Sequence, residues 1–484
     1  MIAGITEKEQ KIIERILDKY CKDYAFFYYG SRVKGTYEKT SDLDVLIKGK
    51  AEMPLAVLQE IKEEFDKSDL PYIVNFSDYY KLDSSFYERI KPDLIPYNWQ
   101  EVKLGDVVEI RRGASPRPIH LFLSDIGMPW VKIADATSDS SRYISKTNEC
   151  IKEEGIAHSV MVEPETLIVS NSATPGLPKI MKIKACVHDG WLVFSNYKGI
   201  SRDFLYYKFK DIQRFLINQA NGSVFQNLKT DIVRDFSINL PPLEVQKKIA
   251  GVLGALDDKI ELNNKINQNL EAQAQALFKS WFVDFEPFGG QMPSDWKIGR
   301  LGEIADITMG QSPNGSSYNE DKQGCIFFQG RAEFGKRFPS VRLYTTEPKR
   351  MAKKNDILMS VRAPVGDFNI AVEDCCIGRG LCSIRAKGNF QSFVLYTIWG
   401  LQKQLEIFNG EGTVFGAINK DSLNSLPITI PSLTDIVQFE HIVSSLDNII
   451  RNNFLENTRL AELRDTLLPK LMSGEINVDD VKID

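Results

Sequence analysis

Two long stretches of the chain place apolar residues at alternating steps of four and three. They cover residues 249–277 and 439–467, and adding 190 to a position in the first stretch gives its counterpart in the second. This period is that of a coiled-coil helix. Both stripes are apolar at their ends and carry two asparagines in the middle, which are Asn263 and Asn267 in the first stripe. Because asparagine in such a seam fixes register and partner, the pattern predicts two long helices that pair with each other.

The segments that precede these helices also repeat. The residue numbers of matched pairs differ by 197 near the start of each segment and by 190 further on. Matched pairs include Trp99 with Trp296, Gly105 with Gly302, Pro241 with Pro431, and Asp257 with Asp447. A copy of this size is a whole domain rather than a small solenoid unit. The chain therefore contains two equivalent domains, each followed by a long helix, while residues 1–95 have no counterpart.

The duplication bears on how the two helices pair. Pseudo-two-fold symmetry favours an antiparallel pair, in which the asparagines meet near the centre, although a parallel pair would align them as well. The alternative is that each helix packs only on its own domain. A helix over residues 249–277 is about 42 Å long at 1.5 Å per residue. Such a helix would hold the two domains apart by somewhat more than one turn of B-DNA.

The two domains ahead of the helices have a mixed α/β pattern. Short apolar runs such as residues 166–169 and 357–361 are bounded by Gly, Pro, Ser and Asn, and they predict strands. The aromatic-rich stretches 205–219 and 393–408 predict helices.

Composition places the chain among folded proteins and excludes some ways of binding nucleic acid. Of its 484 residues, 43% are hydrophobic and 26% are charged, which is too apolar for a disordered chain. The net charge of −5 argues against a protein that coats nucleic acid with positive charge. Counted by segment, residues 96–240 carry +2 and residues 293–430 carry +3, whereas the remaining segments are acidic. The two repeated domains are therefore the parts best suited to a polyanionic partner.

The cysteines and the hydropathy pattern bear on location. Seven cysteines occur without a Cys-x-x-Cys pair, so they predict neither a zinc site nor a disulfide framework and indicate a reducing cytoplasm. No signal peptide is recognisable, and no apolar run is long enough to span a membrane. Residues 96–484 also lack paired catalytic carboxylates, a metal cluster and a Ser/His arrangement. We therefore expect a cytoplasmic protein whose repeated domains bind rather than catalyse.

Basic residues gather in the loops of both repeated domains. Arginine and lysine beside Gly, Ser and Asn contact phosphates and base edges in DNA complexes, although solvated surface charge explains any single residue equally well. The candidate DNA-binding residues are Arg111, Arg112, Arg117 and Lys132 in the first domain and Arg331, Lys336, Arg337 and Arg362 in the second. Arg362 and Arg379 lie in apolar or Gly-flanked motifs, so the alternative for these two is a structural arginine held by a buried carboxylate.

Several short motifs occur in a fixed order, and some of them occur twice. Each repeated domain opens with Pro-x-x-Trp-x-x-x-x-Leu-Gly, starting at Pro96 and Pro293. The further motifs are Gly310-Gln-Ser-Pro313, Phe328-Gln-Gly330, Val361-Arg-Ala-Pro-Val-Gly366, Ile377-Gly-Arg-Gly380, Leu240-Pro-Pro-Leu-Glu-Val-Gln246, Leu256-Asp-Asp-Lys-Ile260 and Phe278-Lys-Ser-Trp-Phe-Val-Asp-Phe285. Together they cover residues 96–472 and resemble the specificity subunit of type I restriction–modification systems.

This resemblance implies an architecture and a set of partners. It implies two target-recognition domains, each of which reads one half of a bipartite sequence in double-stranded DNA. Two antiparallel helices would set the spacing of the half-sites and dock two DNA methyltransferase subunits. The subunit itself would perform no chemistry and need no cofactor of its own. Its partners would bring S-adenosylmethionine and, in systems that cleave DNA, a restriction motor-nuclease subunit with ATP and Mg²⁺.

The N-terminal segment carries a different motif. A strand-like run is followed by Gly30-Ser31-Arg32 and then by Asp42-Leu-Asp44 at the start of a second strand. Two aspartates at i and i+2 on a strand face the same side and can share a divalent cation. A Gly-Ser turn supplies backbone donors for a triphosphate.

The combination resembles the minimal nucleotidyltransferases of the polymerase-β-like superfamily over residues 1–92. The resemblance implies that Gly30, Ser31 and Arg32 bind a nucleotide and that Asp42 and Asp44 bind Mg²⁺.

That family also places a third carboxylate on a later strand. The matching segment, residues 70–78, has Asn75 where family members have Asp. A neutral amide would weaken both metal binding and activation of an attacking hydroxyl. Asp78 is three residues further on and would face the other side of a regular strand. Three interpretations follow: an inactive module, an active transferase that modifies a protein or small acceptor, or a remnant of an antitoxin-like gene that acts as a docking unit.

The predicted fold class is α+β and multidomain, with a small α/β nucleotidyltransferase-like domain ahead of two mixed α/β recognition domains and two antiparallel coiled-coil helices in pseudo-two-fold arrangement. The predicted boundaries are 1–92 for the nucleotidyltransferase-like domain, 96–242 and 293–432 for the recognition domains, 243–285 for the first spacer helix, and 433–484 for the second spacer helix with its tail. The leading function is a DNA specificity subunit. The alternatives are an active nucleotidyltransferase that the recognition domains target, and an assembly protein that never reads DNA.

Overall fold

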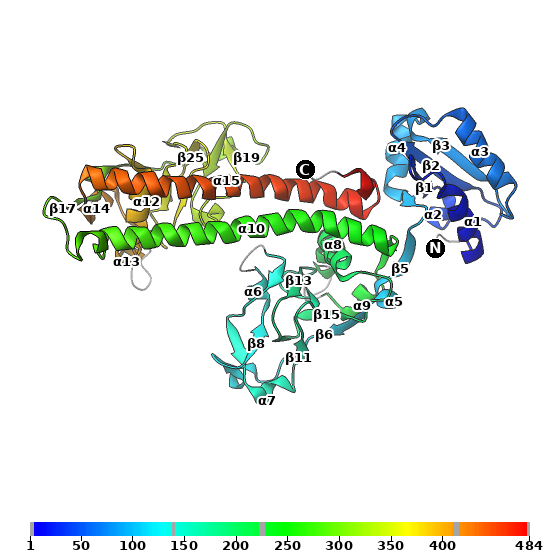
Figure 1. Ribbon diagram of the computed structural model, residues 1–484, viewed down its shortest axis with the longest axis horizontal. Coiled ribbons are helices and arrows are strands. Elements are labelled where there is room, and N and C mark those ends of the chain that lie inside the picture. Colours follow the sequence, from blue (N-terminus) through cyan, green and yellow to red (C-terminus); the bar gives the residue numbers. More distant parts are fainter. Residues whose placement is uncertain (1–3, 138–140, 222–227, 410–415, 482–484) are drawn as a thin grey trace. The chain divides into compact units, whose positions relative to one another are not determined.

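The computed structural model describes residues 4–137, 141–221, 228–409 and 416–481 (Figure 1). The chain divides into two compact units, which are Met1–Lys259 with Leu460–Asp484, and Ile260–Arg459. The first unit contains the N-terminal module, the first recognition domain and the C-terminal tail. The second unit contains the second recognition domain, and the two long helices contribute to both units.

A four-stranded sheet forms the N-terminal module. Its strand order is β3-β2-β1-β4, in which β2 pairs antiparallel with β1 and parallel with β3. Its elements are α1 (Glu7–Leu17), β1 (Tyr24–Tyr29), α2 (Ser31–Lys34), β2 (Leu43–Gly49), α3 (Leu55–Asp66), β3 (Val74–Asp78), α4 (Ser84–Ile90) and β4 (Ile95–Pro96). Alternation along β2 directs Leu43, Val45 and Ile47 into the core that α1 and α3 cover. Since β4 pairs with β1, this sheet extends beyond residue 92.

The first recognition domain contains two five-stranded sheets and a two-stranded one. Their strand orders are β6-β15-β12-β13-β9, β11-β14-β8-β10-β7 and β16-β5. The elements are β5 (Gln100–Lys103), α5 (Leu104–Val107), β6 (Glu109–Arg112), β7 (Leu123–Ser124), β8 (Met128–Val131), α6 (Ile133–Thr137), β9 (Tyr143–Ile144), β10 (Glu149–Ile151), α7 (Glu153–Ile156), β11 (Val160–Val162), β12 (Leu167–Ser170), β13 (Pro178–Met181), β14 (Ala185–Val187), β15 (Trp191–Ser195), α8 (Arg202–Asn221), α9 (Thr230–Arg234) and β16 (Ser237–Leu240). The predicted strand at 166–169 is β12, whose residues are all buried because it lies between β13 and β15.

The second recognition domain has the corresponding sheets. Their orders are β18-β26-β23-β24, β19-β21-β20-β25-β22 and β17-β27. The elements are β17 (Lys297–Arg300), α11 (Leu301–Ile304), β18 (Ala305–Met309), β19 (Tyr318–Asn319), β20 (Cys325–Phe328), β21 (Tyr344–Thr345), β22 (Met351–Ala352), β23 (Ile357–Ser360), β24 (Phe368–Ile370), β25 (Cys375–Ile377), β26 (Leu381–Ala386), α12 (Gln391–Gly400), α13 (Gln402–Glu406), α14 (Lys420–Asn424) and β27 (Pro427–Ile430). The predicted helix over 393–408 is divided at Leu401 into α12 and α13.

The internal repeat is confirmed by strand pairing. The strand that opens each domain pairs antiparallel with the strand that closes it, through Lys103 with Ser237 in the first domain and Arg300 with Pro427 in the second. Arg300 follows Lys103 by 197, and Pro427 follows Ser237 by 190. These are the two offsets found in the sequence, so the repeat in sequence is a repeat in structure.

The two long helices extend further than the apolar stripes that predict them. Helix α10 spans Leu243–Phe282 and α15 spans Leu433–Met472, with 40 residues each, or about 60 Å at 1.5 Å per residue. Within the second unit, Asn263 Nδ2 donates to Asn457 Oδ1 at 2.9 Å and Asn453 Nδ2 donates to Asn267 Oδ1 at 2.8 Å.

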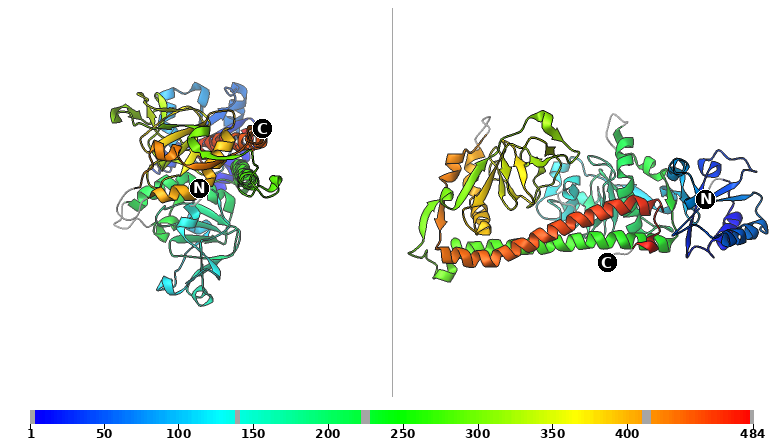
Figure 2. Two further views of the ribbon diagram at one scale, coloured as in Figure 1. Left: turned by 90° about the vertical axis from the view of Figure 1, so that its left-hand side faces the viewer. Right: turned by 90° about the horizontal axis from the view of Figure 1, so that it is seen from above.

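Between these two contacts the residue number rises along α10 and falls along α15, so the pair is antiparallel (Figures 1 and 2). In the first unit, Arg464 of α15 also binds Asp257 of α10 at 2.6 Å. The alternative that each helix packs only on its own domain is wrong. The asparagines satisfy one another as predicted, and Asn264 joins them by accepting from Asn457 Nδ2 at 3.0 Å. Among the described residues, no helix combines the length and apolarity needed to cross a membrane.

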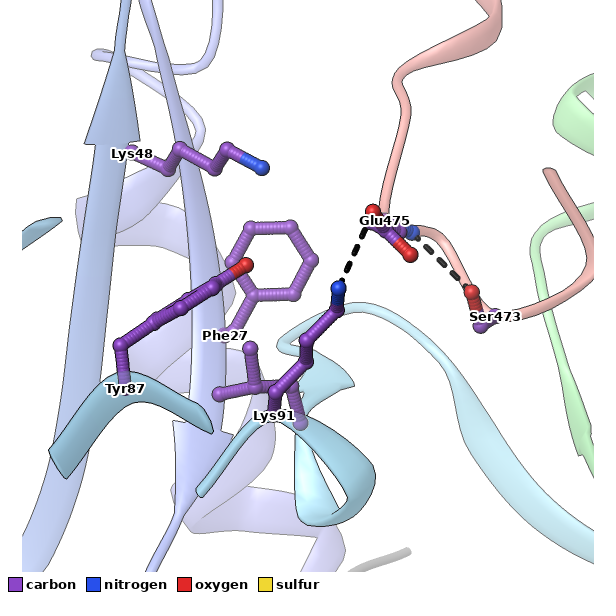
Figure 3. Close-up of a pocket in the computed structure, with 7 residues that line it drawn as sticks. Phe27, Lys48, Tyr87, Lys91, Ser473 and Glu475 are labelled. Carbon is purple, nitrogen blue, oxygen red and sulfur yellow. Dashed lines mark hydrogen bonds and ion pairs between the residues drawn. The ribbon is translucent and has the colours of Figure 1, made fainter. Parts of the chain in front are cut away.

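The C-terminal tail contacts the N-terminal module within the first unit. Lys91 Nζ lies 3.8 Å from a carboxylate oxygen of Glu475, and both residues line a small pocket together with Phe27, Lys48 and Tyr87 (Figure 3). The pocket has a volume of about 40 Å³. Because pockets for nucleotide-sized ligands have volumes of roughly 300 Å³ or more, this junction joins two parts of the chain rather than holding a ligand.

Candidate functional site

One loop and one turn lie against each other in the same way in both recognition domains. The loops follow β6 and β18, and the turns precede β15 and β26. A Cβ at Gly113 would lie 2.2 Å from the carbonyl oxygen of His188, and a Cβ at Gly310 would lie 2.2 Å from that of Gly378. Only glycine permits this approach of the loop to the turn.

The next hydrogen bond is also repeated. Ser115 Oγ accepts from the backbone N–H of Asp189 at 3.3 Å, and Ser312 Oγ accepts from that of Arg379 at 3.2 Å. The Gly-x-Ser segment therefore fixes the loop on the turn in each domain, and the two turns place residues 189 and 379 at equivalent positions.

In the first domain the turn carries an acidic residue that organises two arginines. Arg117 Nη2 donates to a carboxylate oxygen of Asp189 at 3.1 Å, and Arg112 Nε donates to the Asp189 carbonyl at 2.8 Å. Burial disfavours the charged carboxylate, but the hydrogen bond from Ser115 and the charge of Arg117 outweigh that effect, so the pKa of Asp189 lies below its ordinary value. Asp189 therefore remains ionised and holds Arg112 and Arg117, whose side chains both stay more than half exposed.

The second domain has different charges at the three equivalent positions. Met309 and Asn314 lie at the offsets that correspond to Arg112 and Arg117, and the exposed Arg379 stands where the first domain has Asp189. Each loop and turn thus presents a net charge of +1 from these three positions, with different side chains. Sequence reasoning missed Asp189; its correspondence with Arg379 in the internal repeat was the available signal.

The predicted DNA-binding residues have different surroundings. Lys132 forms an ion pair with Glu149 at 2.5 Å, and Arg331 forms one with Asp367. The residues with exposed side chains are Arg111, Arg112, Arg117, Lys132, Arg331, Lys336 and Arg362. These remain candidates for contact with a polyanion.

Arg337 is a correction to the prediction. Its side chain is only 8% exposed and donates to Asp447 at 2.5 Å and to Glu271 at 3.0 Å. It is a buried structural arginine that reaches both long helices, so it has no place on a DNA-facing surface. Arg362 and Arg379 are exposed, so the alternative that they are structural arginines held by a buried carboxylate is wrong. A structural role was not predicted for Arg337.

The N-terminal module gathers its predicted residues at one edge of the sheet. Gly30 links β1 to α2 with φ +84°, and a Cβ there would lie 2.2 Å from Asp44 Oδ2. The glycine is therefore required twice, by its backbone conformation and by the close approach of the carboxylate. Burial raises the pKa of Asp44, and the negative charge of Asp42 adds to this effect.

Asn75 occupies the position expected of the third carboxylate. It lies opposite Asp44 in the parallel register of β2 and β3. Its Nδ2 donates to Asp42 Oδ2 at 2.9 Å. The neutral amide of Asn75 thus donates a hydrogen bond to the carboxylate oxygen of Asp42 that a cation would otherwise bind. Among the described residues, no group of three or more His, Cys, Asp or Glu is arranged to hold a metal ion. The residues present therefore do not fit the three-carboxylate, cation-dependent site of the family.

Asp78 does not replace the missing carboxylate. Its side chain is 9% exposed and accepts from the backbone N–H groups of Met53 at 2.7 Å and Tyr80 at 2.9 Å. It caps the short 3-10 turn at Tyr79–Lys81 and lies on the other side of the strand from Asn75, as the strand period predicts.

Arg32 is a second correction. Its side chain is 1% exposed and donates to the backbone carbonyls of Gly4 at 3.0 Å and Ser41 at 2.6 Å. It also lies over the ring of Tyr72, 3.9 Å from the centroid. Because the guanidinium donates its hydrogen bonds to backbone carbonyls of the chain, Arg32 positions the segment that leads into Asp42 and does not contact a nucleotide.

Comparisons with known proteins match the N-terminal module and the rest of the chain to different families. The family described as type I restriction modification DNA specificity domain matches residues 96–272 and 293–465. The nucleotidyltransferase domain family matches residues 9–103. The recognition region and the N-terminal module therefore belong to two different families.

Individual relatives agree with this division. A putative type I restriction enzyme MjaX specificity subunit from Methanocaldococcus jannaschii is 32% identical over 79% of this chain and 95% of its own length. The probable protein adenylyltransferase MntA from Haemophilus influenzae is 36% identical over 18% of this chain and 76% of its own length. A crystal structure of the type I restriction-modification S subunit from M. genitalium shares the fold at 16% identity and a TM-score of 0.50, covering 77% of this chain and 96% of that one.

Proposed function

This chain belongs to the family of type I restriction–modification DNA specificity subunits, and we propose that each of its recognition domains reads one half of a bipartite site in double-stranded DNA. The observation that carries the proposal is the repeated loop and turn with different charges. Asp189 with Arg112 and Arg117 in one domain, and Arg379 in the other, give two similar frames with different reading side chains. Because base edges are distinguished by the donors and acceptors that meet them, two unlike half-sites are expected.

Selection from random DNA tests this function. We expect the full chain, with its methyltransferase subunits, to enrich duplexes that carry two fixed half-sites separated by a fixed number of unspecified base pairs. Replacing Arg379 with alanine should lower the preference at one half-site by about tenfold, because a good arginine–base contact contributes about 1–3 kcal/mol. The other half-site should be unaffected, which serves as the internal control. A pool that shows no enrichment over random sequence would leave only an assembly role.

The long helices are proposed to dock the methyltransferase subunits. In the second unit, Leu262 and Ile266 of α10 and Ile442 and Ile449 of α15 are between 37% and 53% exposed. Apolar residues exposed on a paired helix are typical of a surface that another helix covers. S-adenosylmethionine would then be supplied by the methyltransferase subunits. Restriction subunits that use ATP would join the same assembly.

We further propose that the N-terminal module does not transfer nucleotides and serves as a docking unit. Asn75 beside Asp42 supports this, since a neutral donor takes the place of a carboxylate. Replacing Asn75 with Asp should add the third carboxylate, and we expect Mn²⁺ to raise the unfolding temperature of this variant but not that of the parent chain. The control is the same variant with Asp44→Ala, which should lose the effect.

Transfer of label from ATP gives the opposing outcome. If the unmodified chain labels itself or an acceptor, and Asp42→Ala removes that labelling, then the module is an active transferase and the docking proposal fails.

A further inference from the structure

An arginine, a buried tyrosine and an aspartate meet where each recognition domain packs on a long helix. In the first unit, Arg142 Nη1 donates to the hydroxyl of Tyr207 at 3.2 Å, and that hydroxyl donates to Asp257 at 2.7 Å. In the second unit, Arg337 Nη1 donates to the hydroxyl of Tyr396 at 3.3 Å, and that hydroxyl donates to Asp447 at 2.9 Å. We call these two sets the first and the second triad.

The triads are structurally equivalent although their sequence offsets differ. Asp447 follows Asp257 by 190, whereas Arg337 follows Arg142 by 195. The arginines nevertheless occupy the same place, because the backbone carbonyl of each accepts at 2.9 Å from an isoleucine that keeps the offset of the aspartates, Ile180 in one domain and Ile370 in the other. The triad has therefore been kept in both copies while loops around it changed in length.

Each triad joins three elements. The arginine comes from the body of the recognition domain, the tyrosine from the domain helix (α8 or α12), and the aspartate from a long helix (α10 or α15). Tyr207 and Tyr396 are among the most deeply buried side chains of the chain. In the first triad, Arg142 also pairs with the exposed Asp258, and Arg464 binds Asp257 at 2.6 Å. In the second, Arg337 binds Asp447 directly at 2.5 Å and Glu271 at 3.0 Å. Both helices of the pair thus reach each triad.

The charged groups of the triads are largely withdrawn from solvent, which argues that they orient each recognition domain on its helix rather than stabilise the fold. A buried ion pair is often no more stabilising than an apolar replacement, because desolvation offsets the attraction. Its directional bonds nevertheless permit only one arrangement of the groups that it joins. Apolar packing alone would allow a domain to settle at several angles on its helix.

We propose that the two triads are positioning clamps that set the angle of each recognition domain on the helix pair and thereby the number of base pairs tolerated between the half-sites. This inference rests on the proposed function. Arg142, Tyr207 and Asp257 act in the first unit, and Arg337, Tyr396 and Asp447 act in the second. None of these residues needs to touch DNA.

Tyr396→Phe tests the second clamp with the smallest change. The variant keeps the ring and loses both hydrogen bonds of the hydroxyl. The full chain is assayed with its methyltransferase subunits on duplexes that hold both half-sites constant and vary their separation one base pair at a time. We expect the preference for the best separation over its neighbours to fall by about tenfold, since the lost bonds involve charged groups. Base preference within each half-site should stay unchanged.

Tyr207→Phe should have the same effect, because the first triad is equivalent. The matched control is Tyr318→Phe, whose hydroxyl donates to the Pro313 carbonyl inside the second recognition domain at 3.1 Å and does not reach a helix. Asp447→Asn is the stronger variant, because it leaves Arg337 with a reduced counter-charge. Its unfolding temperature is measured in parallel, so that a lost fold is not taken for a lost clamp.

The outcomes separate this inference from the proposed function. If both tyrosine variants keep the separation preference of the parent chain, the triads are not clamps, and the bipartite reading stands. If binding falls equally at all separations, the triads contribute only to stability, and the inference is overturned. If the parent chain prefers no half-sites, the proposed function itself fails.

Discussion

A chain with four residues inserted into each long helix is expected to lose its original DNA site and to prefer a longer one. The insertions are placed between Lys259 and Ile260 in α10 and between Arg459 and Leu460 in α15, where the chain passes from one unit to the other. Four residues add about 6 Å to a helix, which corresponds to at most about two base pairs of duplex. An insertion of four residues in a coiled coil unwinds it locally without breaking it.

The expected loss at the original separation is roughly 10³-fold, the lower end of the usual ratio between specific and non-specific binding. Selection from duplexes of varied half-site separation measures it. The half-site sequences should be the same before and after the insertion, because neither recognition domain is altered. The control is the double variant Lys259→Ala, Arg459→Ala, which changes the side chains at the junction but not the length. An unchanged optimum in the insertion variant would show that the helices do not set the spacing.

Replacing Phe439 with alanine is expected to give the largest loss of stability. Phe439 is fully buried, at the centre of an aromatic cluster in which the ring centroids of Phe282 and Phe278 lie 5.1 Å and 5.9 Å away. Phe393 and Tyr396 also contact Phe439 in this cluster. Here α10, α15 and the second recognition domain share one core. Truncation leaves a cavity that the surrounding rings cannot close, so we expect the free energy of unfolding to fall by about 3–5 kcal/mol.

Urea unfolding followed by tryptophan fluorescence measures this change, since Trp281 and Trp296 lie in the same cluster. The matched control is Ile442→Ala on the same helix. Ile442 is 45% exposed, so its truncation should change stability by at most about 0.5 kcal/mol. If the proposed docking surface is correct, Ile442→Ala should instead weaken retention of the methyltransferase subunits. Equal stabilities of the two variants would contradict the packing described for Phe439.

The duplication and the helices could be predicted from the sequence alone, because both are periodic. Two constant offsets locate the repeat, and the strands that open and close each domain lie on those offsets. The alternation of four and three predicts a coiled coil, and the asparagines in its seam pair with one another. The Gly-Ser turn and the paired aspartates mark the N-terminal site, because that chemistry requires small and acidic residues at short spacing.

The surroundings of single charged residues could not be predicted from the sequence in the same way. Arg337 in a loop resembles a DNA-binding arginine in sequence, yet residues 66 positions before it and 110 positions after it bury it. Arg32 follows the motif of a nucleotide site, yet backbone carbonyls take its guanidinium. Asp189 carries no local signal, and only the approach of Arg112 and Arg117 gives it a role.

Periodic and local features follow from the order of residues, since the backbone repeats every few residues and places near neighbours predictably. Burial and charge pairing depend on segments that are distant along the chain, and insertions alter the offsets that would reveal them. For this protein, the sequence therefore establishes two recognition domains, a helix pair and a nucleotidyltransferase-like module with one carboxylate missing. Only the folded chain shows that Arg142 and Arg337 occupy the same place where the two domains pack on the long helices, because the hydrogen bonds that define that place join residues far apart in sequence.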